Sequence, residues 1–477
     1  MPISADYRPD ARLENSGLVL FDRVAAADFP QTVLRYRNER AAGSVGLADL
    51  SDDEWIAHFG RFTPLPGNQT GPLALRYHGH QFRHYNPDLG DGRGFLFAQM
   101  QDDRNRLLDL GTKGSGTTPW SRGGDGRLTL KGGVREVLAT ALLEALGVNT
   151  SKSFSLIETG ESLRRYDEPS PTRAAVLVRL SHSHIRFGTF ERLAYHNETE
   201  AMTALVRYAA DNYYPELIDL HGADLTHTLF DAVVTKTAEL TTQWMCAGFV
   251  HGVLNTDNMS LTGESFDYGP YRFLPHYEPG FVAAYFDEGG LYAYARQPDA
   301  VFWNLTQLAR CLSLIGDSQP LIDSLNAFTD RYSVAMAQTF CRRLNITPQG
   351  IEHDTPLMQA AFRGLGAMKT PGSFEGFFFD WFGGEASQTR ALNGPRAGAY
   401  AQQKAAEFRH LIAGYSTSAP EKLAHPLFAQ NEPVTLLYDE IEALWKPIAE
   451  NDDWSLFYEK LAEIERYRTA LGLIEQT

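Results

Sequence analysis

Residues Val250–Pro270 read VHGVLNTDNMSLTGESFDYGP and follow a segment with helical periodicity. The stretch combines a His, two Asn and two Asp with few helix formers, which predicts a loop between regular elements. Two interpretations are open from these residues alone. The stretch is either a catalytic loop that holds a metal ion, or a polar turn between two core elements.

The composition of the whole chain predicts an ordinary globular protein with more than one structural unit. Of its 477 residues, 43% are hydrophobic and 12% aromatic, enough for a sizeable core. Lys and Arg number 43 against 59 Asp and Glu, so the formal net charge is −16. An acidic chain without a long Lys/Arg run is poorly suited to a nucleic-acid backbone. We therefore expect no nucleic-acid partner, and any phosphate binding must be local.

The cysteines and the first residues indicate where the protein works. Cys246, Cys311 and Cys341 lie far apart and form no CxxC motif, which fits a reducing compartment. The opening residues, MPISADYRPDAR, lack both the apolar core of a signal peptide and the pattern of a transit peptide. No apolar run approaches the roughly 18 residues that a membrane helix needs. We expect a cytoplasmic protein that has no membrane partner.

The order of predicted elements favours an α+β fold with two lobes. Residues 94–112 predict two strands around a polar turn, and residues 132–148 predict an amphipathic helix that ends at Gly147. Two further strands are predicted at 153–159 and 174–180, and the pattern is helical from about residue 196. Strands with one inserted helix, followed by a helical body, are typical of a two-lobed nucleotide enzyme of kinase type.

This reading divides the chain into four parts. We expect an N-terminal extension, a β-rich N-lobe, an α-helical C-lobe with the catalytic loop, and a helical C-terminal extension. Their bounds are residues 1–85, 86–195, 196–345 and 346–477.

Three glycines precede the first predicted strand of the N-lobe, in NPDLGDGRGFLF at residues 86–97. Gly90 and Gly92 would let backbone N–H groups approach a phosphate, and Arg93 could add a positive charge. Alone, however, Gly-Asp-Gly is more often a plain turn.

Lys113 ends the second predicted strand, and Glu136 lies on the helix that follows. In kinases a strand lysine contacts the ATP phosphates and pairs with a glutamate of the adjacent helix. A surface lysine and a solvated glutamate are the simpler alternative. The order strand, lysine, Gly-rich loop, helix and glutamate favours the kinase-like pair.

Arg179 and Arg186 lie seven residues apart around the end of a predicted strand, in VLVRLSHSHIRFG at residues 176–188. Paired arginines can make bidentate phosphate contacts. Ordinary surface arginines are the plainer interpretation of this stretch when it is taken alone.

The stretch quoted first carries the most specific pattern. DYG at residues 267–269 resembles the metal-binding DFG motif of kinases, and Asn258 follows Val253 as the catalytic-loop Asn follows the HRD Asp. Asn258 and Asp267 offer the hard oxygen ligands that suit Mg²⁺ or Mn²⁺. Because Val253 stands where the usual base would be, Asp257 is the obvious substitute acid or base.

Taken together, these motifs resemble the selenoprotein O (YdiU-type) family of protein adenylyltransferases. The resemblance lies between about residues 77 and 310, and its carrying stretches are YHGHQF, LGDGRG, DLGTKGSGTTPWSRGGDGRLTLKGGVRE, HSHIRFGTFE, HGVLNTDNMS, DYGPYRFL and YARQP. It implies a protein-kinase-like fold without the usual catalytic Asp. It also implies that ATP binds in a flipped pose and that AMP, rather than phosphate, is transferred to protein hydroxyl groups.

The resemblance further implies roles for single residues. Asp257 would accept a proton, and Asn258 and Asp267 would hold Mg²⁺ or Mn²⁺. Glu136 would support the ATP lysine through an ion pair. The nucleotide would contact Gly90, Gly92, Arg93, Lys113, Asp125, Gly126, Arg179 and Arg186. Many family members carry a redox-active Cys or selenocysteine near the C-terminus, some with a partner Cys after the DYG motif. This chain ends in LGLIEQT and has no Cys in GFVAAYFDEGG, so the sequence leaves disulfide regulation an open question.

We therefore expect AMP transfer from ATP to Ser, Thr or Tyr hydroxyl groups of proteins, with release of pyrophosphate. An atypical kinase that transfers the γ-phosphate is one alternative, and Val253 in place of the HRD Asp argues against it. A catalytically silent pseudokinase that binds ATP as a scaffold is the other. A scaffold does not need two metal ligands, so Asn258 and Asp267 argue against that alternative.

Overall fold

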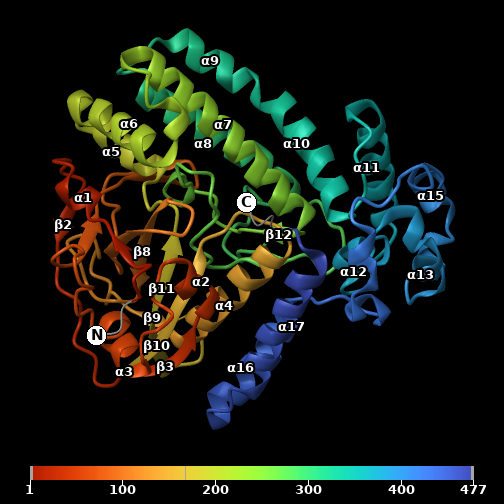
Figure 1. Ribbon diagram of the computed structural model, residues 1–477, viewed down its shortest axis with the longest axis horizontal. Coiled ribbons are helices and arrows are strands. Elements are labelled where there is room, and N and C mark those ends of the chain that lie inside the picture. The colour runs from red at the N-terminus through yellow and green to blue at the C-terminus, as the bar shows by residue number, and fades with distance from the viewer. Residues whose placement is uncertain (1–3, 167, 474–477) are drawn as a thin grey trace.

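The structure, a computed structural model, describes residues 4–166 and 168–473 (Figure 1). The last four residues of the LGLIEQT ending lie outside this part of the chain. A curved antiparallel sheet, with the helices that pack on it, forms one lobe, and the rest of the molecule is mainly helical. Among the described residues, no helix is both long and apolar enough to cross a membrane.

The sheet runs in the order β2-β4-β7-β8-β11-β10-β3, with β1 paired to β7 and β9 paired to β11. Its bounds are β1 (Arg8–Pro9), β2 (Phe21–Arg23), β3 (Val33–Arg37), β4 (Leu73–Leu75), β7 (Leu96–Gln101), β8 (Leu107–Lys113), β9 (Leu128–Thr129), β10 (Lys152–Leu163) and β11 (Thr172–Ser181). The strands predicted from residues 94–112, 153–159 and 174–180 are confirmed as β7, β8, β10 and β11.

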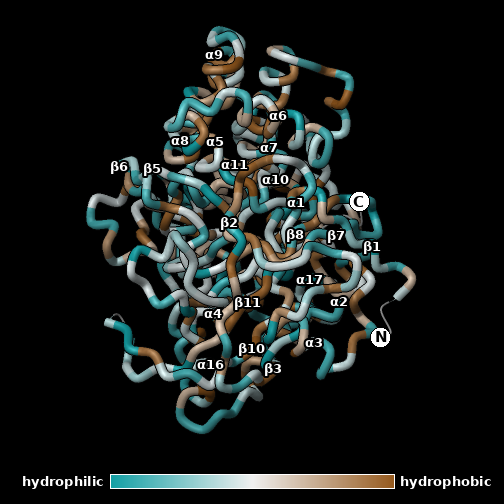
Figure 2. Tube along the Cα trace, turned by 90° about the vertical axis from the view of Figure 1, so that its left-hand side faces the viewer, coloured by the Kyte–Doolittle hydropathy of each residue, from teal (hydrophilic) through white to brown (hydrophobic). Residues whose placement is uncertain are grey.

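The central strands are buried on both faces, which explains their near-continuous apolar sequence. Alternate residues of β11 belong to different cores: Leu177 lies in the core that includes α4 (Leu130–Ala145), whereas Val178 lies in the core that includes α3 (Asp52–Phe59). The traces of β10 and β11 accordingly contain brown, hydrophobic segments in Figure 2. The predicted amphipathic helix is confirmed as α4, and Gly147 follows it with a φ of +79°.

The N-terminal residues contribute to this lobe. They supply β1 to β4, together with α1 (Arg12–Asn15), α2 (Glu39–Ser44) and α3. Trp55 of α3 donates a hydrogen bond to Ser155 of β10 (2.9 Å), so this helix is bound to the sheet by a polar contact as well as by packing. The sheet therefore contains strands from both sides of the boundary expected between residues 85 and 86.

The helical lobe follows β11, as the periodicity predicts. It contains α5 (Phe187–Tyr195), α6 (Thr199–Tyr213), α7 (Gly222–Cys246), α8 (Gln297–Leu312), α9 (Ser318–Asn326) and α10 (Phe328–Arg343). In Figure 1 the long helix α7 lies beside α10. The whole arrangement, a curved sheet followed by helices, is that of a two-lobed kinase-like fold.

Further helices follow the helical lobe. They are α11 (Ile351–Leu365), α12 (Ser373–Asp380), α13 (Gln388–Asn393), α14 (Ala397–Tyr400), α15 (Ala406–Ile412), α16 (Tyr438–Asn451) and α17 (Ser455–Leu471). The last helix returns to the sheet lobe and lies against α4 (Figure 1). Buried Ile464 and Tyr467 of α17 join the same core as Leu142 of α4. The C-terminal segment thus supports the helix that carries Glu136.

Candidate active site

The stretch quoted first forms a loop between two short paired strands. β12 (Phe249–Val250) and β13 (Arg272–Phe273) run antiparallel, with Phe249 opposite Phe273. Between them the chain makes a 3-10 turn at Thr256–Asn258. The predicted loop is therefore confirmed, and a strand pair fixes both of its ends.

Four charged side chains meet where the sheet lobe faces this loop, and we call them the ion network: Lys113, Glu136, Arg179 and Asp267. Lys113 Nζ lies 2.6 Å from Glu136 Oε2 and 2.7 Å from Asp267 Oδ1. Arg179 Nη1 lies 3.4 Å from Glu136 Oε1 and 3.2 Å from Asp267 Oδ1. Each carboxylate thus contacts both cations, and the formal charges of the network cancel.

Strand register explains how the two cations meet. Lys113 of β8 lies opposite Leu177 of β11, and Arg179 lies opposite Gly111. Lys113 and Arg179 are therefore diagonal neighbours on one face of the sheet. Both can reach the same two carboxylates, Glu136 and Asp267. α4 packs against the sheet and brings Glu136 to both of them. The predicted Lys113–Glu136 pair is present, but its junction with Arg179 is a contact that the sequence reading did not include.

Asp267 differs from the other three members because part of it faces outward. Its side chain is 27% exposed, whereas the side chains of Lys113, Glu136 and Arg179 are buried. Burial opposes its ionisation, but Lys113 and Arg179 outweigh burial and hold the pKa of Asp267 well below its usual value. Its backbone is left-handed, with a φ of +65°, a conformation that non-glycine residues adopt mainly at special sites.

Asp257 and Asn258 lie in the 3-10 turn and have a different environment. Asp257 Oδ1 and Asn258 Oδ1 are both buried, and neither has a hydrogen-bond partner among the described residues. Asn258 is oriented by its amide, which donates to the carbonyl of Val253 (3.0 Å). Burial raises the pKa of Asp257 to about 7. The turn thus presents two oxygen acceptors that the protein itself does not satisfy.

Arg186 joins this turn to the glycine-rich stretch. Its guanidinium donates to the carbonyl of Asp257 (3.0 Å) and lies 3.3 Å from Asp91 Oδ1. It also lies over the rings of Tyr77 and Phe266, at 4.3 and 4.9 Å from their centroids. Arg186 is buried, so these contacts fix its position.

The glycines of that stretch allow close packing against the loop that follows Lys113. A Cβ at Gly90 would overlap the ring of Trp120, and one at Gly92 would lie 2.8 Å from the carbonyl oxygen of Trp120. The Gly92 carbonyl accepts a hydrogen bond from the Ser121 hydroxyl (2.6 Å). Arg93 contributes its carbonyl to Gly114 N–H (2.6 Å), while its side chain is exposed. The two loops therefore form one layer beside the ion network.

Asp125 and Gly126 hold the other end of this layer. Asp125 pairs with Arg165 (2.8 Å) and accepts a hydrogen bond from Arg127 N–H (3.0 Å). Gly126 has a φ of +69°, and a Cβ there would overlap the backbone of Gly116. Asp125 contacts its own loop and the β10–β11 hairpin, so the structure does not bring it to the ion network.

A polar layer behind the turn was missed by the sequence reading. The Thr256 hydroxyl donates to Glu191 of α5 (2.6 Å), and Glu191 also lies 2.6 Å from the His80 ring. Asn255 Oδ1 accepts hydrogen bonds from Phe82 N–H (3.1 Å) and Tyr292 OH (2.8 Å). These residues position the turn that carries Asp257. The only sequence signal was that most of them lie in three of the stretches noted above, YHGHQF, HSHIRFGTFE and HGVLNTDNMS, whereas Tyr292 lies in none of these stretches.

The oxygen atoms around the turn suit a hard divalent cation. The described residues contain no group of three or more His, Cys, Asp or Glu that could hold a metal ion. The amide oxygen of Asn258 is outside that definition, and it is buried and without a partner. Together with the partly exposed Asp267 it offers few protein ligands, which is the arrangement Mg²⁺ uses when substrate phosphates and water complete its shell. The residues present therefore fit Mg²⁺ or Mn²⁺.

Comparisons with known proteins found a family model and several similar proteins. The family model described as "Protein adenylyltransferase SelO" matches residues 3–465. A protein of Synechocystis sp. named protein nucleotidyltransferase YdiU is 44% identical over 97% of this chain and 98% of its own length. Proteins of the same name from Gloeobacter violaceus and Trichodesmium erythraeum are 44% and 41% identical, each over 97% of this chain and over 96% and 98% of their own lengths.

Proposed function

Because the chain belongs to the SelO family of protein adenylyltransferases, we propose that its site transfers AMP from ATP to a hydroxyl side chain of a protein. The observation that carries the proposal is the Asp257–Asn258 turn. Its carboxylate is buried, has an unpartnered oxygen and has a pKa raised to about 7, which suits a general base at neutral pH. Val253 stands where a kinase would place its base.

Lys113, Arg179 and Arg186 would bind the triphosphate. Lys113 and Arg179 are held by Glu136 and Asp267 before any ligand arrives, so little reorganisation is needed when phosphate charge approaches. Arg186 is held in the same way by Asp91 and by the carbonyl of Asp257. The glycine-rich layer at Gly90 and Gly92 would cover the nucleotide from the sheet side.

Asn258 and Asp267 would hold Mg²⁺ or Mn²⁺. When bound, the cation supplies positive charge to the phosphate oxygens. The protein's own contribution is to orient the two ligands. Asn258 is turned by its hydrogen bond to Val253, and Asp267 is kept ionised by Lys113 and Arg179.

The chemical step then involves one proton and two bonds. A Ser, Thr or Tyr hydroxyl of the acceptor protein gives its proton to the Asp257 carboxylate. The hydroxyl oxygen forms a bond to the α-phosphorus, and the bond from the α-phosphorus to the β,γ-pyrophosphate breaks. Lys113 and Arg179 stabilise the charge on the departing pyrophosphate. AMP remains on the acceptor protein.

A pair of labelling reactions tests this proposal. A generic protein acceptor is incubated with the protein, Mg²⁺ or Mn²⁺, and ATP labelled at either the α- or the γ-phosphate, beside an Asp267→Ala control. Label retained only from the α position supports AMP transfer. Label retained only from the γ position would instead identify a kinase, and ATP binding with no label from either position would identify a scaffold.

A further inference from the structure

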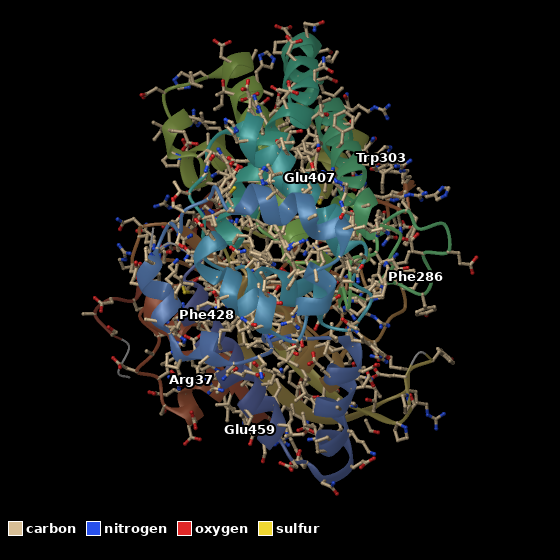
Figure 3. The ribbon with its side chains drawn as sticks, turned by 90° about the vertical axis from the view of Figure 1, so that its right-hand side faces the viewer. Arg37, Phe286, Trp303, Glu407, Phe428 and Glu459 are labelled. Carbon is tan, nitrogen blue, oxygen red and sulfur yellow. The ribbon has the colours of Figure 1, made fainter. Side chains whose placement is uncertain are left out.

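Aromatic side chains gather beside the catalytic loop, and we call Phe82, Tyr285, Phe286, Trp303 and the buried Tyr292 the aromatic platform. Tyr285 is 81% exposed and Phe286 is 47% exposed. The Phe286 ring lies 5.1 Å from Tyr285 and 5.9 Å from Phe82. Single exposed aromatics are common on proteins, but a contiguous group next to a site marks a contact surface. Figure 3 shows Phe286 and Trp303 on the same side of the molecule.

The hairpin that carries Phe82 has an unusual turn. β5 (Gly79–Gln81) and β6 (His84–Asn86) are joined by Phe82 and Arg83, whose φ angles are +50° and +65°. A two-residue turn with both φ values positive normally contains Asn and Gly, because bulky residues are strained there. Turn chemistry therefore does not explain this pair. Arg83 lies over the Trp303 ring, 5.5 Å from its centroid, so the turn places both side chains on the platform.

The loop that carries Tyr285 and Phe286 is held from within. Asp287, which follows them, is buried, and its carboxylate accepts hydrogen bonds from Leu291 N–H and Tyr292 N–H (2.8 Å each). Arg296 donates to the carbonyls of Gly289 and Gly290 (2.9 and 3.1 Å). Two exposed aromatic rings are thus presented on a fixed loop, which reduces the entropy lost when a partner binds.

The platform is physically continuous with the catalytic loop. Phe82 N–H and Tyr292 OH both donate to Asn255, two residues before Asp257. At the other end of β5, a Cβ at Gly79 would lie 2.9 Å from Asp257 Oδ1. Phe82 lies three positions after Gly79 along the strand, a span of roughly 10 Å. Figure 2 shows β5 and β6 at the edge of the molecule, where a polypeptide can reach them.

We propose that the aromatic platform binds the acceptor protein next to its modified hydroxyl. This inference rests on the proposed function and adds a substrate class to it. The span of roughly 10 Å equals about three residues of extended chain. The preferred acceptor is therefore an extended segment with an aromatic or aliphatic side chain two to four residues from the Ser, Thr or Tyr that receives AMP. Exposed aromatic anchors of this kind commonly carry much of the binding energy at protein interfaces.

Two peptide pools test the proposal. Both have a central Ser, Thr or Tyr; one pool has Phe or Leu two to four residues away, and the other has Gln at those positions. The wild-type protein is compared with the double variant Tyr285→Ala/Phe286→Ala, and AMP incorporation is measured from α-labelled ATP. Tyr166→Ala is the matched control, since Tyr166 is fully exposed and lies in the distant β10–β11 hairpin.

We expect the wild type and the Tyr166→Ala control to prefer the apolar pool by roughly tenfold in kcat/KM. The double variant should lose this preference through a higher KM for the peptide, with the KM for ATP unchanged. Phe82→Asn is a second variant, because Asn accepts the positive φ of the turn and removes the ring. It should also weaken the preference without lowering the melting temperature.

Three results would overturn the inference. Equal rates for the two pools with the wild type would remove the proposed acceptor class. A preference that survives in both platform variants would place acceptor binding elsewhere. Loss of self-association in the double variant, seen by sedimentation velocity without a change in peptide KM, would make the platform a contact between two copies of the chain. If the wild type labels a generic protein acceptor but neither peptide pool, this inference fails and the proposed function stands. If it incorporates AMP into no acceptor at all, the proposed function fails, and this inference fails with it.

Discussion

The ion network and the Asp257–Asn258 turn meet on one loop, which supplies Asp267 to the network, but the two regions treat buried polar atoms in opposite ways. In the network each carboxylate contacts both cations, so the charges balance within the protein. In the turn, Asp257 Oδ1 and Asn258 Oδ1 are buried without partners. A buried acceptor left unpaired costs about 1–3 kcal/mol, so such atoms need an explanation. A ligand that satisfies them is the simplest one.

The difference also separates the two carboxylates by their acidity. Lys113 and Arg179 lower the pKa of Asp267 against the effect of burial, whereas burial dominates at Asp257 and raises its pKa to about 7. When the environments of two nearby carboxyl groups shift their pKa values in opposite directions, the two groups can take different chemical roles. Asp267 remains charged and suits a cation, while Asp257 can exchange a proton near neutral pH.

Removing the partly exposed carboxylate of the network should have the largest effect. In Asp267→Ala, Lys113 and Arg179 lose one partner each and the proposed cation loses a ligand. We expect AMP transfer to fall by more than ~10³-fold, measured by incorporation from α-labelled ATP. Asp267→Asn keeps the shape without the charge and should be nearly as inactive. Full activity in either variant would remove the role assigned to this residue.

The turn should respond differently when its base is removed. Asp257→Asn is expected to slow transfer by ~10²–10³-fold, the usual contribution of a general base, while the Kd for ATP changes little. In the wild type, kcat/KM should fall as the pH drops through about 7, because the Asp257 carboxylate becomes protonated. The variant should lack this dependence. Loss of ATP binding in the variant would show that Asp257 is structural.

Glu136→Gln tests whether the network prepares the cations for phosphate. Lys113 and Arg179 would then share Asp267 alone, and we expect the KM for ATP to rise by roughly tenfold. Breaking a buried ion pair also costs about 3–5 kcal/mol of stability. The test therefore needs a control variant that loses a similar amount of stability without touching the network.

Glu144→Gln is the matched control for Glu136→Gln, since Glu144 lies on the same helix and is bound to Arg40 and Lys152 instead. The control should be destabilised in urea without a change in the KM for ATP. A similar rise in KM for both variants would mean that α4 stability, rather than the network, controls ATP binding.

The smallest effect concerns Glu264, a buried carboxyl on the same loop whose pKa burial raises to about 7. It accepts a hydrogen bond from His182 N–H (2.9 Å). A carboxyl whose pKa is raised in the folded state stabilises the fold at low pH, and that stability is lost as the pH rises through the folded pKa. The unfolding free energy of the wild type should therefore fall between pH 5 and pH 8. In Glu264→Gln this fall should be smaller, by about 3 kcal/mol at most. Urea titrations at both pH values would measure it, and an unchanged difference would contradict the assignment.

Local patterns were enough to predict much of this fold. Period-2 and helical periodicities correctly located β7, β8, α4, β10 and β11, because these elements are long and buried. The order of Lys113 and Glu136 along the chain also predicted their ion pair. Strands β1 to β4 were not predicted, because two to five residues carry too little periodicity and their pairing in the sheet is long-range.

The candidate site was predictable only in part, for the same reason. Asn258 and Asp267 stand in a recognisable motif, but nothing near Glu191 or His80 in the sequence shows that they support the turn. Arg179 was expected to contact phosphate, and its bonds to Glu136 and Asp267 depend on strand register. The Arg165 partner of Asp125 comes from a hairpin forty residues away.

The most direct test of the contrast between the two regions is a crystal structure with Mn²⁺ and a non-hydrolysable ATP analogue. Anomalous scattering would locate the metal, and the density would orient the nucleotide. The account predicts Mn²⁺ bound to Asn258 Oδ1 and the Asp267 carboxylate, with the α-phosphorus nearest to Asp257. Mn²⁺ bound away from both residues, or a γ-phosphorus facing Asp257, would contradict it.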